Sequence, residues 1–175
     1  MKAKVKEMVT VEQLANMIDH TNLKAFADDA AFEKLCDEAK KYNFKMVAIN
    51  PAQTVRCKKK LEGSPVHVGA AIGFPLGQTT LECKIFETKD AIANGADEID
   101  MVMNIGALKD KNYDLVRDDV KAVVEAANGT LVKVILETCL LAEDEIKKAC
   151  ELCVEAKADY VKTSTGFSTR GATIE

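Results

Sequence analysis

The chain has 175 residues, of which 47% are hydrophobic and 30% are charged, and its formal net charge is -4 at pH 7. This composition is typical of a globular protein, and the length is sufficient for one sizeable core. We therefore expect a single domain over residues 1–175. The acidic balance, and the lack of Lys and Arg clusters interleaved with aromatic residues, argue against a nucleic-acid partner.

No stretch approaches the roughly 18 to 20 apolar residues that cross a membrane, and Met1–Lys6 is not followed by the apolar core of a secretory signal. The cysteines are scattered singly, apart from a C-x-x-C at Cys150 and Cys153. That pair falls in an amphipathic helical pattern without a nearby histidine, so core packing is favoured over metal binding. We expect no membrane partner, reduced thiols and a cytoplasmic location.

Short apolar runs rich in β-branched residues alternate with longer amphipathic stretches, which is typical of βα units and a parallel sheet. A short helix capped at Thr10 comes first. The predicted strands are Met17–Asn22, Lys45–Asn50, Val66–Gly73, Glu98–Asn104, Leu131–Thr138 and Tyr160–Thr165. Between them, caps and polar first turns predict helices at Ala30–Tyr42, after Pro51, and at Leu81–Asn94, Tyr113–Ala127 and Glu143–Ala156.

Polar residues within these strands separate two candidate architectures. Strands of an open doubly wound sheet are buried on both faces and are almost entirely apolar. Here Asp19, Thr21, Asp100, Lys133 and Lys162 interrupt the apolar runs. A barrel explains this pattern, because its inward side chains converge near the C-terminal mouth. We therefore predict an α/β fold of the TIM-type (β/α) barrel. No G-x-G-x-x-G or P-loop supports nucleotide binding.

Lys162, the lysine in Tyr160–Gly166, lies in an apolar strand that ends in a hydroxyl-rich turn. Desolvation favours the neutral amine, which is the nucleophile of a Schiff-base catalyst. Alternation puts Lys133 and Glu137 on one strand face, and Glu98 and Asp100 on one face of another strand. If those faces point inward, Lys133, Lys162 and Asp100 meet. Two neighbouring cations would each lower the pKa of the other, and a carboxylate could move protons, as in a class I aldolase. An internal salt-bridge cluster without chemistry explains the same residues.

Five ordered motifs resemble 2-deoxyribose-5-phosphate aldolase: Ile18–Thr21, Gly73–Gly77, Gly95–Val102, Val132–Thr138 and Val161–Phe167. The resemblance implies a TIM-type barrel that reversibly cleaves 2-deoxy-D-ribose 5-phosphate into D-glyceraldehyde 3-phosphate and acetaldehyde. It also implies that neither a metal nor an organic cofactor takes part. The partners would be small phosphorylated sugars and aldehydes.

The resemblance also implies roles for individual residues. Lys162 would form the Schiff base, Asp100 would donate and accept protons, and Lys133 would tune the electrostatics of the pair. The expected substrate-binding residues are Asp19, Thr21, Thr165 and Gly166, of which Gly166 would offer its backbone N–H near the phosphate. Neither His20 nor His67 has a metal-ligand spacing, and both are expected to pack or hydrogen-bond locally.

The sequence departs from the family in length, because about six of the eight βα units of the barrel are present. The family carries a second mechanistic lysine on the seventh strand and draws most of its phosphate site from later loops. Six strands cannot close an eight-stranded barrel, so we expect a C-terminally incomplete fragment or a chain that assembles, most simply as a homo-oligomer. A non-catalytic partial barrel acting as an assembly module, and a different Schiff-base aldolase, are the alternative functions.

Overall fold

The computed structural model describes residues 9–173, so the N-terminal segment Met1–Lys6 lies outside the described residues. Six parallel strands form one sheet whose spatial order equals their order in the chain. They are β1 (Asp19–Asn22), β2 (Met46–Ile49), β3 (His67–Ile72), β4 (Glu98–Val102), β5 (Leu131–Ile135) and β6 (Tyr160–Lys162). Each predicted strand is present and is shorter than predicted. β1 begins later than predicted, β2 and β3 are shorter at both ends, and β4, β5 and β6 end earlier.

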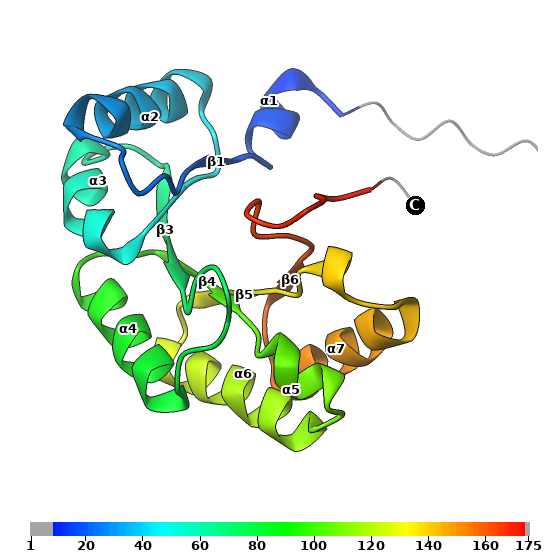
Figure 1. Cartoon of the computed structure of the whole chain (residues 1–175). Helices are drawn as coiled ribbons and strands as arrows, with labels where there is room; N and C mark the ends of the chain where they lie inside the picture. The colour runs from blue at the N-terminus through cyan, green and yellow to red at the C-terminus, as the bar shows by residue number, and fades with distance from the viewer. Residues whose placement is uncertain (1–8, 174–175) are drawn as a thin grey trace, which may run out of the picture.

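The sheet curves into an open ring with the helices outside it (Figure 1). A doubly wound sheet would reverse its strand order at a switch point, and this sheet does not. The fold is therefore part of a (β/α) barrel, as predicted. Among residues 9–173, β1 and β6 each pair with a neighbour on one side only.

The helices follow the predicted order, and none within the described residues is long and apolar enough to cross a membrane. They are α1 (Val11–Ala15), α2 (Asp29–Tyr42), α3 (Thr54–Lys60), α4 (Leu81–Ala93), α5 (Ile105–Lys109), α6 (Tyr113–Ala127) and α7 (Glu143–Glu155). Predicted caps are confirmed, since Thr10, Asp28 and Thr80 each accept a backbone N–H of the first turn. The helix predicted to open at Pro51 begins as a 3₁₀ turn, Pro51–Gln53, and continues as α3. The short α5 and the 3₁₀ turn Thr138–Leu140 were not predicted, because five residues or fewer carry no helical period.

The apolar core lies between the outer face of the sheet and the helices. Its larger part packs β3, β4 and β5 against α4, α6 and α7, and its smaller part lies under α2 and α3. Cys153 is buried in the larger part, and this burial raises the pKa of its thiol to about 12. The prediction that the C-x-x-C packs in the core is therefore confirmed for Cys153, and Cys150 packs against the same cluster.

A buried ion pair joins two helices to the end of a strand, and the sequence did not predict it. The ammonium of Lys84 in α4 lies 2.5 Å from the Asp119 carboxylate in α6 and donates to the Val102 carbonyl at 3.1 Å. The Lys84 side chain has no exposed surface. Burial raises the pKa of Asp119, although the charge of Lys84 opposes this shift. The pair fixes α4 and α6 to the C-terminal end of β4.

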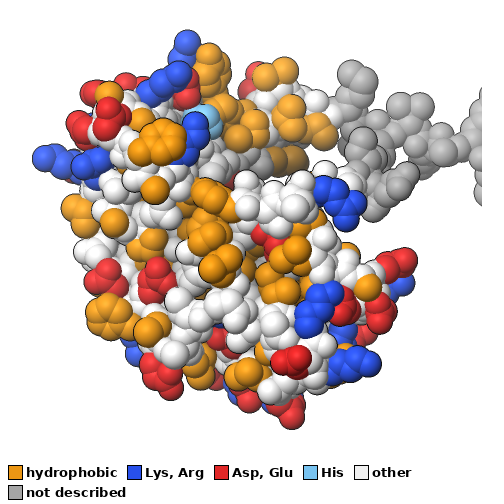
Figure 2. All heavy atoms as spheres, viewed as in Figure 1, with side chains coloured by type: hydrophobic (Ala, Val, Ile, Leu, Met, Phe, Trp, Pro, Cys, Tyr) orange, Lys and Arg blue, Asp and Glu red, His pale blue; other side chains and the backbone are white. Residues whose placement is uncertain are grey.

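Charged side chains lie mainly around the rim of the face that Figure 2 shows, and apolar side chains gather inside the rim. Several exposed apolar side chains belong to α1, the segment after it and β6, which border the open side of the ring (Figure 1). These are Val11, Leu14, Met17, Tyr160 and Val161.

Candidate active site

The polar residues of the strands point into the ring, where five charged side chains meet. The register pairs Asp100 of β4 with Lys133 of β5, and Ile135 of β5 with Lys162 of β6. Alternation then places every second residue of each strand on the inner face. We call the five side chains the inner charged cluster: Asp19, Glu98, Asp100, Lys133 and Lys162.

Lys162 is the last residue of β6 and reaches two carboxylates. Its ammonium donates a hydrogen bond to Oδ2 of Asp100 and lies 3.2 Å from Oδ2 of Asp19. The Lys162 side chain is 30% exposed, whereas Asp100 is almost completely buried. Within residues 9–173, the other Asp100 oxygen, Oδ1, accepts no hydrogen bond. The amine is therefore open to solvent on one side and has a proton acceptor on the other.

Lys133 occupies the centre of the cluster. Its Nζ lies 2.6 Å from Glu98, 3.2 Å from Asp19 and 3.4 Å from Asp100. Burial lowers the pKa of this ammonium, but the charges of Asp100, Asp19 and Glu98 and the contact with Glu98 together outweigh burial, so the pKa is raised. The expectation that two neighbouring cations lower each other's pKa is wrong for Lys133, because three carboxylates surround it.

Glu98 also belongs to the inner charged cluster, although no role was predicted for it from the sequence. It is 1% exposed and its two oxygens contact Lys133 and His67 Nδ1, each at 2.6 Å. The signal was present, because Glu98 and Asp100 are two positions apart on one strand and share its inner face. The two histidines hydrogen-bond locally as predicted, His67 with Glu98 and His20 with Glu38 at 2.8 Å.

A cavity of about 350 Å³ lies next to Asp100 and Lys162. The predicted substrate-binding residues Thr21, Thr165 and Gly166 all line this cavity. Asp19 does not line it, but contacts both lysines from the inner face of β1. The structure thus brings together all seven residues that the sequence singled out, and adds aromatic and apolar walls that include Phe74, Ile135 and Ala71.

The hydroxyl-rich turn after β6 is held by Glu137. Both its carboxylate oxygens accept the Thr165 N–H, at 3.3 and 3.4 Å, and one also accepts the Thr165 hydroxyl. The sequence placed Glu137 on the inner face of the strand with Lys133, and this is wrong. β5 ends at Ile135, and Glu137 has a left-handed backbone with φ of 56°, which directs the chain out of the strand.

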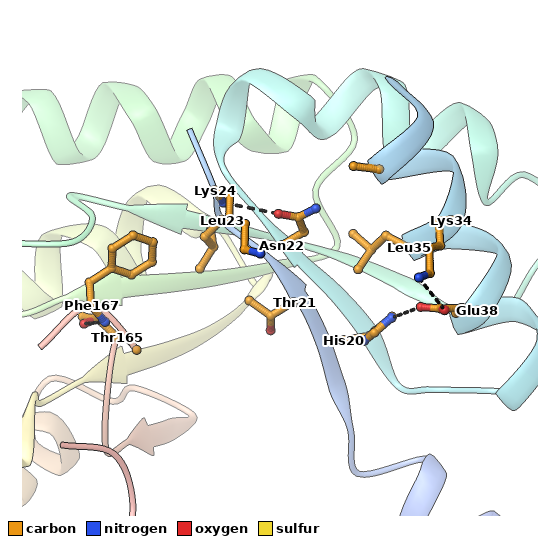
Figure 3. A pocket seen from close by; sticks show the side chains of 12 residues that line it. His20, Thr21, Asn22, Leu23, Lys24, Lys34, Leu35, Glu38, Thr165 and Phe167 are labelled. Atoms are coloured by element: carbon orange, nitrogen blue, oxygen red, sulfur yellow. Dashed lines mark hydrogen bonds and ion pairs between the residues drawn. The ribbon is translucent and has the colours of Figure 1, made fainter. Parts of the chain in front are cut away.

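A larger cavity, of about 590 Å³, lies between the end of β1, residues 165–167 and α2 (Figure 3). Its α2 wall carries Lys34, Leu35 and Glu38, and Glu38 pairs there with His20. None of the inner charged cluster lines this cavity. Asp100 and Lys162 line the smaller cavity, so size does not identify the candidate site.

Residues 13–175 of the sequence match the DeoC/LacD family of aldolases. The chain belongs to this aldolase family. Its sequence is 63% identical over 165 residues to a deoxyribose-phosphate aldolase of Clostridium perfringens, a match that covers 94% of this chain and 74% of the relative. A deoxyribose-phosphate aldolase of Bacteroides thetaiotaomicron is 53% identical over 178 residues, with 99% and 75% covered.

Solved structures of the family share the fold. A chain assigned as a deoxyribose-phosphate aldolase from Coccidioides immitis has a TM-score of 0.92 at 45% identity, and the match covers 94% of this chain and 65% of that one. The deoxyribose phosphate aldolase from Aeropyrum pernix, whose structure is described as a unique tetramer, has a TM-score of 0.86 at 34% identity, with 94% and 69% covered. This aldolase-family chain therefore spans about two thirds to three quarters of the length of these relatives.

The comparisons confirm the family that the five motifs indicated, and with it a carbon–carbon lyase of the deoxyribose-phosphate aldolase type. They also confirm the partial TIM-type barrel. The roles of the individual residues in this aldolase-family chain are a separate question, and they rest on the geometry of the inner charged cluster.

Proposed function

We propose that this chain carries the Schiff-base centre of a class I aldolase that reversibly cleaves 2-deoxy-D-ribose 5-phosphate to D-glyceraldehyde 3-phosphate and acetaldehyde. The observation that carries the proposal is the Lys162 amine, which borders a 350 Å³ cavity while hydrogen-bonded to a buried carboxylate. A structural salt bridge needs no cavity beside its cation, whereas a nucleophile does.

In the cleavage direction, the free amine of Lys162 attacks the C1 aldehyde of the open-chain sugar and gives a carbinolamine. Loss of water gives the Schiff base, which acts as the electron sink. Removal of the C3 hydroxyl proton then breaks the C2–C3 bond, releases glyceraldehyde 3-phosphate and leaves an enamine. Protonation at C2 and hydrolysis release acetaldehyde and restore the amine. Each of these steps, bond cleavage included, needs a group that moves a proton.

Asp100 is the group we assign to these proton transfers. Its Oδ2 already accepts a hydrogen bond from Lys162, and its Oδ1, which lies 3.4 Å from Lys133 Nζ, accepts no hydrogen bond among the described residues. Its near-complete burial strengthens its interactions with the reacting groups. Lys133 lies 3.4 Å from Asp100 and tunes the charge of the pair.

The turn after β6 and the end of β1 supply the binding groups. We assign Thr21 and Thr165 to contacts with substrate hydroxyls or a proton-relaying water, together with Asp19, which touches both lysines. Gly166, with φ of 82° and open space around its Cα, presents backbone to the cavity and is assigned to the phosphate.

The reaction itself tests this proposal. Purified chain is incubated with 2-deoxyribose 5-phosphate, and acetaldehyde release is followed with a coupled dehydrogenase. We expect release that Lys162→Ala abolishes and that Lys147→Ala, an exposed lysine of α7, leaves unchanged. Equal release by the chain and Lys162→Ala would overturn the assignment.

We also propose that the chain works in the cytoplasm as a homo-oligomer. Six free cysteines support a reducing compartment. The edge strands β1 and β6, and the exposed Val11, Leu14 and Met17 beside them, support assembly. Size-exclusion chromatography with light scattering tests the oligomer, and a monomer that unfolds cooperatively and binds no apolar dye would contradict it.

A further inference from the structure

One histidine contacts the buried end of the inner charged cluster. The Glu98 carboxylate is 1% exposed and is shared between two donors, His67 Nδ1 and Lys133 Nζ, each 2.6 Å away. The His67 side chain, at the start of β3, is 40% exposed. One end of this buried carboxylate thus faces a group that exchanges protons with water, and the other end faces the lysine at the centre of the cluster.

The contacts continue from Lys133 to the reactive amine. Lys133 Nζ lies 3.2 Å from Asp19 and 3.4 Å from Asp100, and each of these carboxylates also contacts Lys162 Nζ. A change of charge at His67 is therefore felt at Lys162 through the buried Glu98 and Asp100 and the partly buried Lys133, where screening by solvent is weaker than at the surface.

The surroundings of His67 make Glu98 the dominant partner. On β2, its register neighbour is the uncharged Met46, and the carbonyl of Lys45 accepts its backbone N–H. A cavity at this end of the strands is lined by Glu98 together with Lys45, Asp19 and Lys133. Within residues 9–173, Glu98 is the one carboxylate recorded in contact with the imidazole.

We propose that His67 is a positioning residue for Schiff-base formation at Lys162, and that its protonation extends the reaction to lower pH. This inference rests on the proposed function. The cluster contains three carboxylates and two ammonium groups, so Lys162 lies in a group of side chains with an excess negative charge. Histidine is the side chain whose charge ordinarily changes between about pH 5 and 8. The imidazolium offsets the excess charge and so favours the free amine.

The test is the initial rate at which cyanoborohydride traps acetaldehyde on Lys162, measured across pH in the parent, His67→Gln and His67→Arg. Near pH 5.5, we expect the trapping rate of the parent to exceed that of His67→Gln by about threefold to tenfold, which is the size of a Coulomb interaction over several ångströms at moderate dielectric. Near about pH 8.5, the two rates should converge. His67→Arg keeps the charge at every pH, so it should match the parent at low pH and exceed it at high pH.

The chain supplies a matched control in its second histidine. His20 also pairs with a glutamate, Glu38 at 2.8 Å, but this pair lies outside the inner charged cluster. His20→Gln should therefore reproduce the pH profile of the parent. If the ratio of the trapping rates of the parent and His67→Gln stays constant with pH, the inference is overturned, because loss of packing alone gives a constant ratio. An equal change in the pH profile of His20→Gln would also overturn it.

A second measurement does not depend on the reaction. Because an added cation opposes the three carboxylates around Lys133, the pKa of Lys133, followed by NMR of its Cε–Nζ group, should be lower in His67→Arg than in His67→Gln. Equal pKa values of Lys133 in the two variants would overturn the coupling even if trapping succeeds.

The two measurements also distinguish this inference from the proposed function. A folded parent that traps no acetaldehyde while this pKa difference is present would contradict the proposed function, and would leave the coupling of His67 to the cluster standing. Should His67→Gln not fold, the parent replaces it, measured above the range in which histidine ordinarily changes charge.

Discussion

The ammonium of Lys162 donates a hydrogen bond to the buried carboxylate of Asp100, although 62 positions separate the two residues in the chain. Parallel pairing of β4, β5 and β6 makes this contact possible, because it aligns Asp100 with Lys133 and Ile135 with Lys162. The proposed nucleophile and its proposed proton acceptor are thus held by strands rather than by loops. That rigidity is what an attack on a small aldehyde requires.

Asp100→Asn tests proton transfer in this pair. The amide keeps the shape of the side chain but cannot accept the ammonium proton, so we expect turnover to fall by about 10²- to 10⁴-fold with little change in substrate binding. Steady-state kinetics of the cleavage reaction measure both quantities. An unchanged turnover would show that another group moves the protons.

Lys133→Met tests the raised pKa of Lys133. An ammonium whose pKa is higher in the folded than in the unfolded protein stabilises the folded state. This stabilisation is complete below about pH 10.5, the ordinary pKa of lysine, and is lost as the pH rises through the raised pKa of Lys133. Urea unfolding from about pH 9 to 12 should therefore show a steeper loss of stability in the parent than in Lys133→Met. Lys121→Met, at an exposed position of α6, controls for other alkaline titrations. Equal slopes in all three proteins would contradict the raised pKa.

Lys84→Met tests the buried ion pair of α4 and α6. Removing the lysine leaves the Asp119 carboxylate buried without its cation, which costs about 3 to 5 kcal/mol of unfolding free energy. The double variant Lys84→Met with Asp119→Leu removes both charges and should recover most of that loss. Denaturant unfolding measures both. A single variant within about 1 kcal/mol of the parent would mean that water or another group takes over the role of Lys84.

Gly77→Ala tests the close approach of the Gly73–Gly77 motif to the end of β4. A Cβ at Gly77 would lie 2.0 Å from the Met103 carbonyl oxygen, and its φ of 69° strains any other residue. We expect a loss of about 2 to 4 kcal/mol, because backbone cannot yield as a side chain does. Gly171→Ala, where a Cβ meets nothing within 4 Å, should be nearly neutral in the same thermal unfolding experiment.

Much of the fold follows from local signals in the sequence. The capping residues Thr10, Asp28 and Thr80 set helix starts that the structure reproduces. Charged residues within apolar strands also indicated an inward-facing polar site, because such residues have no place against the outer helices. Helix α5 and the pairing of Lys84 with Asp119 had no such signal, since one is too short to show a period and the other joins residues 35 positions apart.

The misjudged details of the site have electrostatic and backbone causes. The sequence indicated Lys133, Lys162 and Asp100 as the central group. The direction in which the pKa of Lys133 shifts depends on the number of carboxylates around it. Glu98 shares an inner face with Asp100, yet its partner His67 comes from another strand. Glu137 follows the strand alternation in the sequence, and only the left-handed turn after Ile135 shows why it holds Thr165 instead.

The central claim is that Lys162 is an amine that captures an aldehyde. Folded chain is treated with acetaldehyde and borohydride, digested, and examined by mass spectrometry. The account predicts one added ethyl group on the peptide that contains Lys162, its absence in Lys162→Ala, and no comparable addition on the exposed Lys147. Folded protein in which Lys162 stays unmodified, or in which labelling spreads evenly over surface lysines, would contradict the account.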